Sequence, residues 1–484
     1  MSANTQFRVI VVGGGVAGLT ASHCLQKAGI DHVVLERRGD IAPPEGASIA
    51  IYPHGARILQ QVGILKTMEK ACVPCKRFLS RRPDGKAISN NGFFDYVKEN
   101  HGQDILLFER REFLQLLYDT LPDKTPIRKG CGVIAVKDNA SGVEVTLKDG
   151  SVEKGDIVIG ADGVRSAIRS IMWENANREK PGLITVDEKT SMKTYWKCLV
   201  GMGPAALELG ESDMTVVHDD RFSFLALTQP DRAFWFVFVA LDEPFSWPRR
   251  ARYTDEDAEA LAVEVADHPV SDSLVFGELW RNRYRGALIS LEEGVLEHWY
   301  HGRIALAGDS VHKVTPNIAF GGNLAMESVV ALCNCIQEMM VAQRGAKPSR
   351  ATIEKAFAKY QAKQKDRARE VMNVSGQITK LQAWYTPLYK FAANWVSPYL
   401  PDRTIANQLG EVIRKAPKLD YVNFADFKNN RLPWKYNDQN TVGRSSTVTA
   451  KVSSRYLQGV FQLALSTIAV VTVVISLGSW RNIL

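Results

Sequence analysis

Apolar and polar positions along the first 35 residues predict a strand, a helix and a second strand in quick succession. Residues 7–12 form an apolar run rich in β-branched side chains, residues 16–28 repeat apolar positions with helical spacing up to Gly29, and residues 32–35 are apolar again. This order is typical of a βαβ unit with a parallel sheet.

The middle of the chain follows a period of two instead. Between residues 193 and 301 apolar and polar positions alternate, most clearly in "FSFLALTQ" and "RAFWFVFVAL", which predicts an antiparallel sheet. Beyond it we expect an apolar strand at residues 304–307, a helix at residues 323–340 and a long charged helix at residues 349–380.

Together these patterns predict an α/β fold. A Rossmann-type nucleotide-binding domain is interrupted by an antiparallel-sheet domain and followed by a helical C-terminal region. The expected segments are the first part of the nucleotide-binding domain at 1–175, the substrate-binding sheet domain at 176–301, the second part with the long helix at 302–380, an aromatic and helical region at 381–437, a tether at 438–455 and a transmembrane helix at 456–480.

The transmembrane prediction rests on "YLQGVFQLALSTIAVVTVVISLGSW", which contains no charged residue. As a helix this stretch would be ~37 Å long, against a bilayer hydrocarbon core of ~30 Å. Tyr456 and Trp480 mark its ends, and Arg455 and Arg481 flank it. We therefore expect a single-pass C-terminal anchor in the endoplasmic reticulum or another endomembrane. Because the N-terminal apolar run lacks a signal-peptide cleavage site, the catalytic part should stay cytosolic.

Composition narrows the class further. A chain of 484 residues, 45% hydrophobic and 23% charged, can bury a large core. The net charge of +7 is mild and no basic block is interleaved with aromatics, so no nucleic-acid partner is predicted. The seven cysteines are scattered and odd in number, as expected of reduced thiols. "CVPC" has no second pair to match it, so no metal site is predicted.

The turn after the first strand carries the spacing G-x-G-x-x-G at Gly13, Gly15 and Gly18. Glycines at this spacing permit the turn, the close approach of a pyrophosphate and tight packing of helix on strand. The N-terminus of the following helix directs its positive dipole end at the phosphates. Glu36 ends the second strand, where a carboxylate can accept hydrogen bonds from an adenosine ribose. The unit therefore predicts a dinucleotide site.

Two further motifs indicate which dinucleotide is bound. "GDIVIGADGVRSAIR" places Asp162-Gly163 after an apolar strand, and "GRIALAGDSVHKVTPNIAFGGNLAMESVVAL" places Gly308-Asp309 after another. With these motifs in this order, the chain resembles the single-component FAD-dependent aromatic and olefin monooxygenases from Gly13 onward. The resemblance implies FAD as cofactor and NAD(P)H as co-substrate.

The resemblance also implies several cofactor contacts. Asp309 would bind the FAD ribityl hydroxyls, and the backbone at Gly321 and Gly322 would lie near the pyrophosphate and isoalloxazine, at the start of the helix at 323–340. Asp162 is similar to an aspartate that serves both FAD and NAD(P)H.

On the other side of the cofactor, "LFERREFLQLLYDTL" resembles a segment in which an arginine at a helix start reaches the flavin. Arg110 is the better match and Arg111 is the alternative. "EGASIAIYPHGARIL" resembles the loop beside the flavin, with Gly46 and Ala50 close to the cofactor.

"GDSVHKVTPN" and "HVVLERR…GASI" extend the resemblance to a fungal branch, the epoxidases of indole-diterpene and meroterpenoid pathways. That branch usually continues "G-Q-G-G-N", whereas this chain reads Ala319-Phe320-Gly321-Gly322-Asn323. We expect the bulky Phe320 near the flavin ring to change the shape of the active site.

The implied activity is that of an FAD-dependent, NAD(P)H-consuming monooxygenase. A flavin hydroperoxide would epoxidise a terminal olefin of a prenylated or terpenoid intermediate in fungal secondary metabolism. Aromatic hydroxylation stays open. So do two other classes, a non-oxygenating flavoprotein and a flavin halogenase, although the chain lacks the halogenase signature "WxWxIP".

NAD(P)H would reach the flavin from solution, because no second complete nucleotide-binding unit is evident. "GMGPAA" at residues 201–206 mimics G-x-G-x-x-A, but Pro204 and Gly210 leave no helix of useful length, so it predicts a turn.

His218 and Tyr195 are the candidate catalytic residues. In the family the antiparallel sheet roofs the substrate over the flavin, and either side chain could hold a proton there. A surface position is the alternative for His218, and His312 is predicted to belong to the cofactor loop.

The predicted partners are a small lipophilic substrate, a prenylated aromatic or an indole terpenoid, together with molecular oxygen and membrane lipid. The aromatic stretch at 381–401 either lies at the membrane interface, caps the substrate entrance or simply packs.

Overall fold

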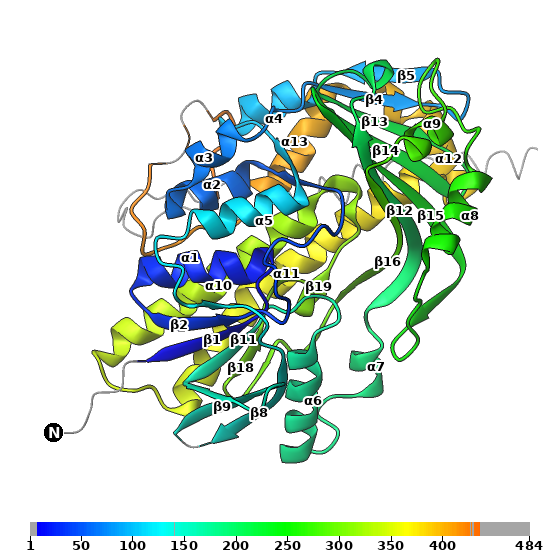
Figure 1. Cartoon of the computed structure of the whole chain (residues 1–484). Helices are drawn as coiled ribbons and strands as arrows, with labels where there is room; N and C mark the ends of the chain where they lie inside the picture. The colour runs from blue at the N-terminus through cyan, green and yellow to red at the C-terminus, as the bar shows by residue number, and fades with distance from the viewer. Residues whose placement is uncertain (1–6, 140, 426, 428–429, 436–484) are drawn as a thin grey trace, which may run out of the picture. The chain divides into compact units, whose positions relative to one another are not determined.

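A computed structural model of the chain describes residues 7–139, 141–425, 427 and 430–435 (Figure 1). The predicted tether and transmembrane helix, at residues 438–455 and 456–480, lie outside the described residues.

A six-stranded sheet forms the centre of the nucleotide-binding half. All neighbours except the β17–β18 edge pair run parallel, and β1 lies between β2 and β11. Its strands read as nearly continuous apolar runs because both faces are covered. The order is β17 (Tyr300–His301), β18 (Ile304–Leu306), β11 (Ile157–Gly160), β1 (Arg8–Val12), β2 (Asp31–Leu35) and β7 (Ile127–Arg128).

Two helices cover one face of this sheet, and a small antiparallel sheet covers the other (Figure 1). α1 (Val16–Ala28) packs beside α10 (Phe320–Gln343), and α10 packs on the long α11 (Arg350–Gln382). The small sheet consists of β8 (Val133–Asn139), β9 (Gly142–Leu147) and β10 (Val152–Gly155), with α6 (Ala167–Glu179) against β8.

Among the described helices, α10 alone is long and apolar enough to cross a membrane, but 78% of its most apolar window is buried. It is a core helix. Glu327 and Arg367 join α10 to α11 through two buried hydrogen bonds of 3.0 and 3.1 Å.

An eight-stranded sheet forms the second half. It is antiparallel except for the pairing of β13 with β4, and β14 and β15 pair as their alternating sequences predict. β4 and β5 come from a segment that precedes the predicted sheet domain. The order is β19 (His312–Lys313), β16 (Arg285–Val295), β12 (Lys193–Pro204), β15 (Arg232–Ser246), β14 (Phe222–Gln229), β13 (Asp213–His218), β4 (Arg77–Arg81) and β5 (Ala87–Asn91).

Alternate residues of this sheet enter two different cores. The side facing the nucleotide-binding half, here called the inner face, includes Trp196, Val216, Leu225 and Phe236 of the main cluster. The outer face packs under α8 (Asp255–Glu264) and α9 (Phe276–Arg281) in a separate cluster. Because successive side chains of a strand point to opposite faces, the period of two places alternate residues on the inner face and on the outer face.

The predicted turn at residues 201–206 is wrong in its first part, because Gly201–Pro204 continue β12. A Cβ at Gly201 would lie 2.6 Å from Nε1 of Trp235. Glycine is therefore required by the packing of an aromatic ring against the strand, and not by a nucleotide.

The other elements surround the junction of the two halves. A two-stranded sheet pairs β3 (Ser48–Ile51) with β6 (Leu106–Glu109). The remaining helices are α2 (Pro53–Val62), α3 (Leu65–Lys70), α4 (Phe93–His101), α5 (Arg110–Asp119), α7 (Val186–Lys189), α12 (Pro387–Trp395) and α13 (Asp402–Ile413), with short 3₁₀ turns η1 (Leu207–Leu209), η2 (Gly308–Ser310), η3 (Pro316–Ile318) and η4 (Ser397–Tyr399).

Candidate active site

The glycine turn between β1 and α1 is built so that two of its glycines admit no side chain. Gly13 has a φ of +107°, and a Cβ there would lie 2.4 Å from the carbonyl oxygen of Ala161. A Cβ at Gly18 would lie 1.8 Å from the carbonyl oxygen of Gly13. At Gly15 nothing lies within 4 Å of such a Cβ. The turn thus leaves open space at Gly15, where the N-terminus of α1 can receive a pyrophosphate.

Glu36 holds this turn from the end of β2. Its Oε2 accepts a 2.6 Å hydrogen bond from the Gly14 amide, and its Oε1 accepts one of 2.8 Å from the Arg38 amide. A small cavity lies beside the carboxylate and is lined by Gly14, Gly15, Glu36, Arg38, Asp40, Ile41, Pro43, Arg110 and Leu114. Its position matches the ribose and phosphate end of a dinucleotide.

Arg110 faces this cavity and Arg111 does not line it. Arg110 is the first residue of α5, and a Cβ at Gly46 would lie 3.1 Å from its Cδ. Burial lowers the pKa of Arg110, while Asp309 and Glu45 favour its charged form. Arg111 instead donates a 3.1 Å hydrogen bond to the Ala42 carbonyl. The structure therefore favours Arg110 as the arginine that meets the cofactor.

Asp309 lies in η2 directly after β18, where its carboxylate pairs with Lys313. Together with Arg110 it extends the site from the glycine turn toward the start of α10, as a ribityl contact requires.

Helix α10 begins at Phe320, three residues before the predicted start, so Gly321 and Gly322 lie inside its first turn. A Cβ at Gly322 would lie 2.6 Å from Cδ1 of Ile49 in β3. Asn323 secures the same contact, because its Nδ2 donates to the Ala50 carbonyl at 2.8 Å. Gly322 therefore lies against β3 beside Ala50, with Asn323 as a positioning residue whose role was not predicted.

Phe320 differs from its expected role. Its side chain is 1% exposed and packs edge-on against Tyr52, at 4.7 Å between ring centroids, and against His54 at 5.2 Å. The ring belongs to the core between α10 and α2, where it extends the helix toward its N-terminus. The bulk of this side chain therefore fills the protein core behind the site.

The carboxylate of Asp162 accepts hydrogen bonds from the start of the helix that follows it. One carboxylate oxygen accepts from the Ser166 hydroxyl at 2.5 Å, and the other accepts from the Ala167 and Ile168 amides at 2.7 and 3.1 Å. Burial raises the pKa of this carboxyl. The Asp162 backbone also lies beside Gly13. Asp162 thus fixes the start of α6 next to the glycine turn.

His218 lies on the inner face of the sheet and is only 7% exposed, so the surface alternative is wrong. Its Nε2 is 2.8 Å from the hydroxyl of Ser80 on the neighbouring strand β4. Trp384 stacks on its ring, with centroids 6.4 Å apart. Burial lowers the pKa of His218 to about 4, so the imidazole is neutral at pH 7.

Tyr195 lies apart from His218. It occupies a bulge of β12, between Thr194 and Trp196. Strands β15 and β14 separate β12 from β13, which places the two backbones about 14 Å apart at the usual strand spacing. The two predicted catalytic residues therefore do not form a pair. Ser80 and Trp384, which do contact His218, carry no sequence motif that could have singled them out.

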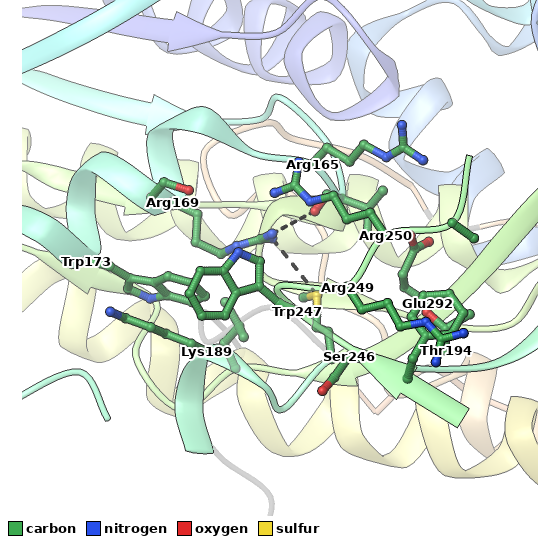
Figure 2. Close-up of a pocket in the computed structure, with 16 residues that line it drawn as sticks. Arg165, Arg169, Trp173, Lys189, Thr194, Ser246, Trp247, Arg249, Arg250 and Glu292 are labelled. Carbon is green, nitrogen blue, oxygen red and sulfur yellow. Dashed lines mark hydrogen bonds between the residues drawn. The ribbon is translucent and has the colours of Figure 1, made fainter. Parts of the chain in front are cut away.

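A second, basic pocket opens beside α6 (Figure 2). Its lining includes one carboxylate, Glu292, and a group of cationic and indole side chains. These are Arg165, Arg169, Lys189, Arg249, Arg250, Trp173 and Trp247. Arg169 is held in place by hydrogen bonds to the carbonyls of Ser310, at 2.9 Å, and Val164, at 2.7 Å. The pocket is thereby connected to the loop that carries Asp309.

His312 begins the short strand β19 between η2 and η3 and is 1% exposed against Trp299, with ring centroids 5.3 Å apart. Burial lowers its pKa to about 4. Cys72 and Cys75 are unpaired thiols, and burial raises the pKa of each to about 12. Among the described residues no group of three or more His, Cys, Asp or Glu side chains is arranged to hold a metal ion.

The glycine turn, Glu36 and Arg110 border one cavity that suits a dinucleotide, and Asp309 lies near enough to Arg110 to favour its charged form. This arrangement agrees with the FAD site that the family resemblance implies. The fold and the site thus define an FAD-dependent oxidoreductase.

Comparison with known proteins agrees with this class. Residues 6–375 match the family model described as "FAD binding domain". The chain belongs to this family and is an FAD-dependent monooxygenase related to several fungal enzymes of that name.

Two of these relatives show the extent of the similarity. The FAD-dependent monooxygenase DEP2 of Alternaria brassicicola is 42% identical over 431 residues, covering 88% of this chain and 81% of the relative. The FAD-dependent monooxygenase ptmM of Penicillium ochrochloron is 36% identical over 379 residues, covering 78% and 89%.

Among solved structures, Klebsiella pneumoniae HpxO complexed with FAD and uric acid superposes with a TM-score of 0.69 at 21% identity, covering 85% of this chain and 97% of HpxO. FqzB superposes with a TM-score of 0.64 at 18% identity, covering 84% and 93%. These structures share the fold.

Proposed function

We propose that this monooxygenase epoxidises a terminal olefin of a prenylated or terpenoid intermediate in fungal secondary metabolism, with NAD(P)H as reductant. The observation that carries the proposal is the apolar and aromatic inner face on which His218 is buried. Phenol hydroxylation benefits from a base that takes the phenol proton, and a group with a pKa of about 4 is a poor base at pH 7. An olefin has no proton to remove, and bound FAD supplies the oxygen chemistry.

The surroundings of His218 support an apolar substrate. Trp196, Leu225, Phe236 and Phe238 lie on the same inner face and belong to the main apolar cluster. Nε1 of Trp196 and Nε1 of Trp384 have no hydrogen-bond partner within the described chain. Buried indole N–H groups usually find a partner, so a substrate carbonyl or hydroxyl is a suitable acceptor. We infer a lipophilic substrate with a polar end, such as a prenylated aromatic.

Aromatic hydroxylation is the second candidate, and one residue favours it. Glu293 lies two residues from Leu291 and from Val295, which both face the main core. Its Oε2 would be 3.4 Å from a Cβ at Gly376 on α11, and burial raises the pKa of its carboxyl. A carboxyl of raised pKa can act as the base that a phenol needs.

For the reductant, we propose that NAD(P)H places its phosphates in the basic pocket of Figure 2. Several cations line it together with the indole of Trp247, which is 43% exposed and has Nζ of Lys189 6.0 Å from its ring centroid. Guanidinium groups match phosphate geometry, and an indole face can stack on adenine. The additional 2′-phosphate of NADPH gives these cations one more partner, so we expect NADPH to be preferred over NADH.

Substitution of the basic pocket tests the reductant site. Arg250→Ala should raise KM for NADPH about 10-fold or more, since a phosphate contact contributes about 1.5–3 kcal/mol, and should raise KM for NADH less. Arg252→Ala is the matched control, because Arg252 is exposed nearby but does not line the pocket. FAD content should be unchanged in both variants. Equal KM values for Arg250→Ala and Arg252→Ala would remove the pocket from the proposal.

The reaction itself is tested with a panel of farnesylated and geranylgeranylated aromatics, FAD and NADPH. A true substrate should accelerate NADPH oxidation and oxygen uptake and yield stoichiometric product. Glu293→Gln separates the two candidates, because an epoxidase should retain its turnover and a hydroxylase should lose most of it. Chloride-dependent product would indicate halogenation, and NADPH oxidation without oxygen uptake would indicate a non-oxygenating flavoprotein.

Localisation remains part of the proposal. The uncharged stretch at 456–480 is proposed to anchor the chain in an endomembrane, with the catalytic part in the cytosol, where a lipophilic substrate is concentrated in the adjacent bilayer.

A further inference from the structure

Large apolar side chains are exposed in one short stretch after α11. Five of them lie within 13 consecutive residues, here called the α12 patch. They are Leu388 at 36%, Phe391 at 47%, Trp395 at 65%, Tyr399 at 76% and Leu400 at 37% exposed. Clusters of this kind mark interaction sites, whereas single exposed apolar residues do not.

Three residues of this patch lie on one face of helix α12. Leu388, Phe391 and Trp395 stand at i, i+3 and i+7, which is one face of a helix. On the other side Ala393 is 3% exposed, and Nζ of Lys390 lies 2.6 Å from a carboxylate oxygen of Asp220. Nζ of Lys390 also lies 4.7 Å from the ring centroid of Trp384. The apolar face is thus held outward by contacts of the opposite face.

The composition of the patch suits a lipid surface. Residues 381–401 contain no Asp or Glu, and Lys390 is their one charged residue. Tryptophan and tyrosine favour the membrane–water interface, and carboxylates are repelled by anionic lipid. A helix of this kind lies in the interface plane and does not span the bilayer.

The length of chain that follows the described residues also supports a lipid surface as the partner of the α12 patch. The described residues end at Lys435, and the uncharged stretch begins at Tyr456. An extended linker of about 20 residues spans at most ~70 Å. An anchor at 456–480 would therefore keep the α12 patch within reach of the same bilayer.

The patch adjoins the candidate substrate site through a single aromatic layer. The Trp384 ring lies between Lys390 at the surface and His218 on the inner face. Tyr385, the next residue, has its ring centroid 5.5 Å from that of Trp196. A molecule that leaves the bilayer at α12 would meet this pair of rings before it reached His218.

We propose that the α12 patch rests on a bilayer surface and admits lipophilic substrate from it to the inner face past Trp384. The inference rests on the proposed function for the nature of the substrate and for the anchor at 456–480. Docking is measured without any substrate, so the two can fail separately.

Depth-dependent fluorescence quenching tests the docking. In a Cys72→Ser, Cys131→Ser background, Phe391→Cys or Trp395→Cys in the full chain carries an NBD label. Val341→Cys and Leu207→Cys are the controls, since these residues are 67% and 78% exposed outside the patch. In phosphatidylcholine/phosphatidylserine vesicles with 5-doxyl lipid, we expect strong quenching at 391 and 395 and little at 341 and 207.

Two outcomes would overturn docking. One is the absence of quenching at 391 and 395 in vesicle-bound protein. The other is a label at 395 that is already shielded from aqueous iodide without lipid, since a second copy or another part of the chain would then cover the patch.

Kinetics test the entry route. Phe391→Ser/Trp395→Ser should raise KM about 5-fold or more for a geranylgeranylated substrate carried in vesicles, and should leave kcat, FAD content and KM for a short water-soluble prenyl phenol unchanged. Val341→Ser is the matched control. Quenching with unchanged KM would contradict entry at α12. Quenching with no epoxide product from the wild-type enzyme would contradict the proposed function alone.

Discussion

The glycine turn and the inner face of the eight-stranded sheet both belong to the candidate active site, but they are built differently. The turn binds through backbone amides and open space at Gly15, and its closest packing partners are backbone atoms. The inner face instead presents side chains such as His218, Ser80 and Trp384, which come from β13, β4 and the segment after α11. In the proposed function the turn holds FAD, and the inner face selects the substrate.

Because of this difference, the glycine turn identifies the cofactor family, whereas the substrate has to be inferred from the side chains of the inner face. A binding site made of backbone amides, here called the backbone cradle and formed by the turn at Gly13, Gly15 and Gly18, depends on glycine spacing. Such spacing is shared among enzymes that use the same cofactor. A side-chain surface assembled from distant strands can change residue by residue without loss of the fold.

The largest expected effect tests the backbone cradle. In Gly18→Ala the new Cβ would lie 1.8 Å from the Gly13 carbonyl oxygen, so β1 and α1 cannot keep their packing. We expect complete loss of bound FAD, measured as flavin absorbance after gel filtration. Gly15→Ala is the control, because its Cβ meets nothing and should leave the fold intact while weakening FAD binding. Stoichiometric FAD in Gly18→Ala would contradict the cradle.

On the inner face, His218 should make stability depend on pH. Burial lowers its folded pKa to about 4, from 6.5 when unfolded, so only the unfolded chain takes up its proton between these values. The stabilisation is complete above pH 6.5 and is lost as the pH falls toward 4, by up to about 3 kcal/mol.

The variant His218→Phe should flatten this part of the curve of unfolding free energy against pH, followed by urea denaturation. His312 lies elsewhere with a pKa also lowered to about 4, so by the same argument His312→Phe should flatten the curve by a similar amount. FAD content should not change in His218→Phe. An unaltered slope would show that His218 is not buried as described.

A smaller effect is expected at the edge of the cradle. Glu36→Gln keeps the shape of the side chain but loses the carboxylate charge that strengthens the hydrogen bond from the Gly14 amide and, by our prediction, those from the cofactor ribose. Charge-assisted hydrogen bonds contribute about 1.5–3 kcal/mol, so FAD affinity should fall about 10- to 100-fold by fluorescence titration. Asp40→Asn, a change on the rim of the same cavity, should alter affinity much less.

The smallest effect tests the connection between the two regions at the start of α10. Ala319 has a φ of +53°, a conformation that glycine adopts without strain. Ala319→Gly should stabilise the protein by no more than about 1 kcal/mol, seen as a slightly higher Tm, with unchanged FAD content. A lower Tm would mean that the Ala319 methyl group contributes packing that outweighs this strain.

The glycine turn and its flanking elements could be predicted from the sequence, whereas elements that depend on long-range contacts could not. β1, α1 and β2 were predictable because a strand period, a helix period and a glycine turn follow one another within 35 residues. The start of α10 was placed three residues late, because the packing of Phe320 on Tyr52 and His54 is a long-range contact. The continuation of β12 through Gly201–Pro204 depends in the same way on Trp235 of a neighbouring strand.

The candidate site shows the limit most clearly. The cofactor roles of Arg110 and Asp309 are predictions from the family resemblance, and the structure places Asp309 near enough to Arg110 to favour its charged form. Ser80 lies 138 residues from His218 in the chain, and no local pattern connects them. The separation of Tyr195 from His218 likewise depends on strand order, which alternation alone does not reveal.

The most direct test of the central claim is the position of oxygen in the product. Purified full-chain enzyme with FAD and NADPH, a substrate chosen from the panel and ¹⁸O₂ gas would be followed by mass spectrometry and NMR. One labelled oxygen bridging the terminal prenyl double bond is the predicted result. A labelled ring hydroxyl with an intact double bond would contradict the epoxidase account and move the reaction to aromatic hydroxylation.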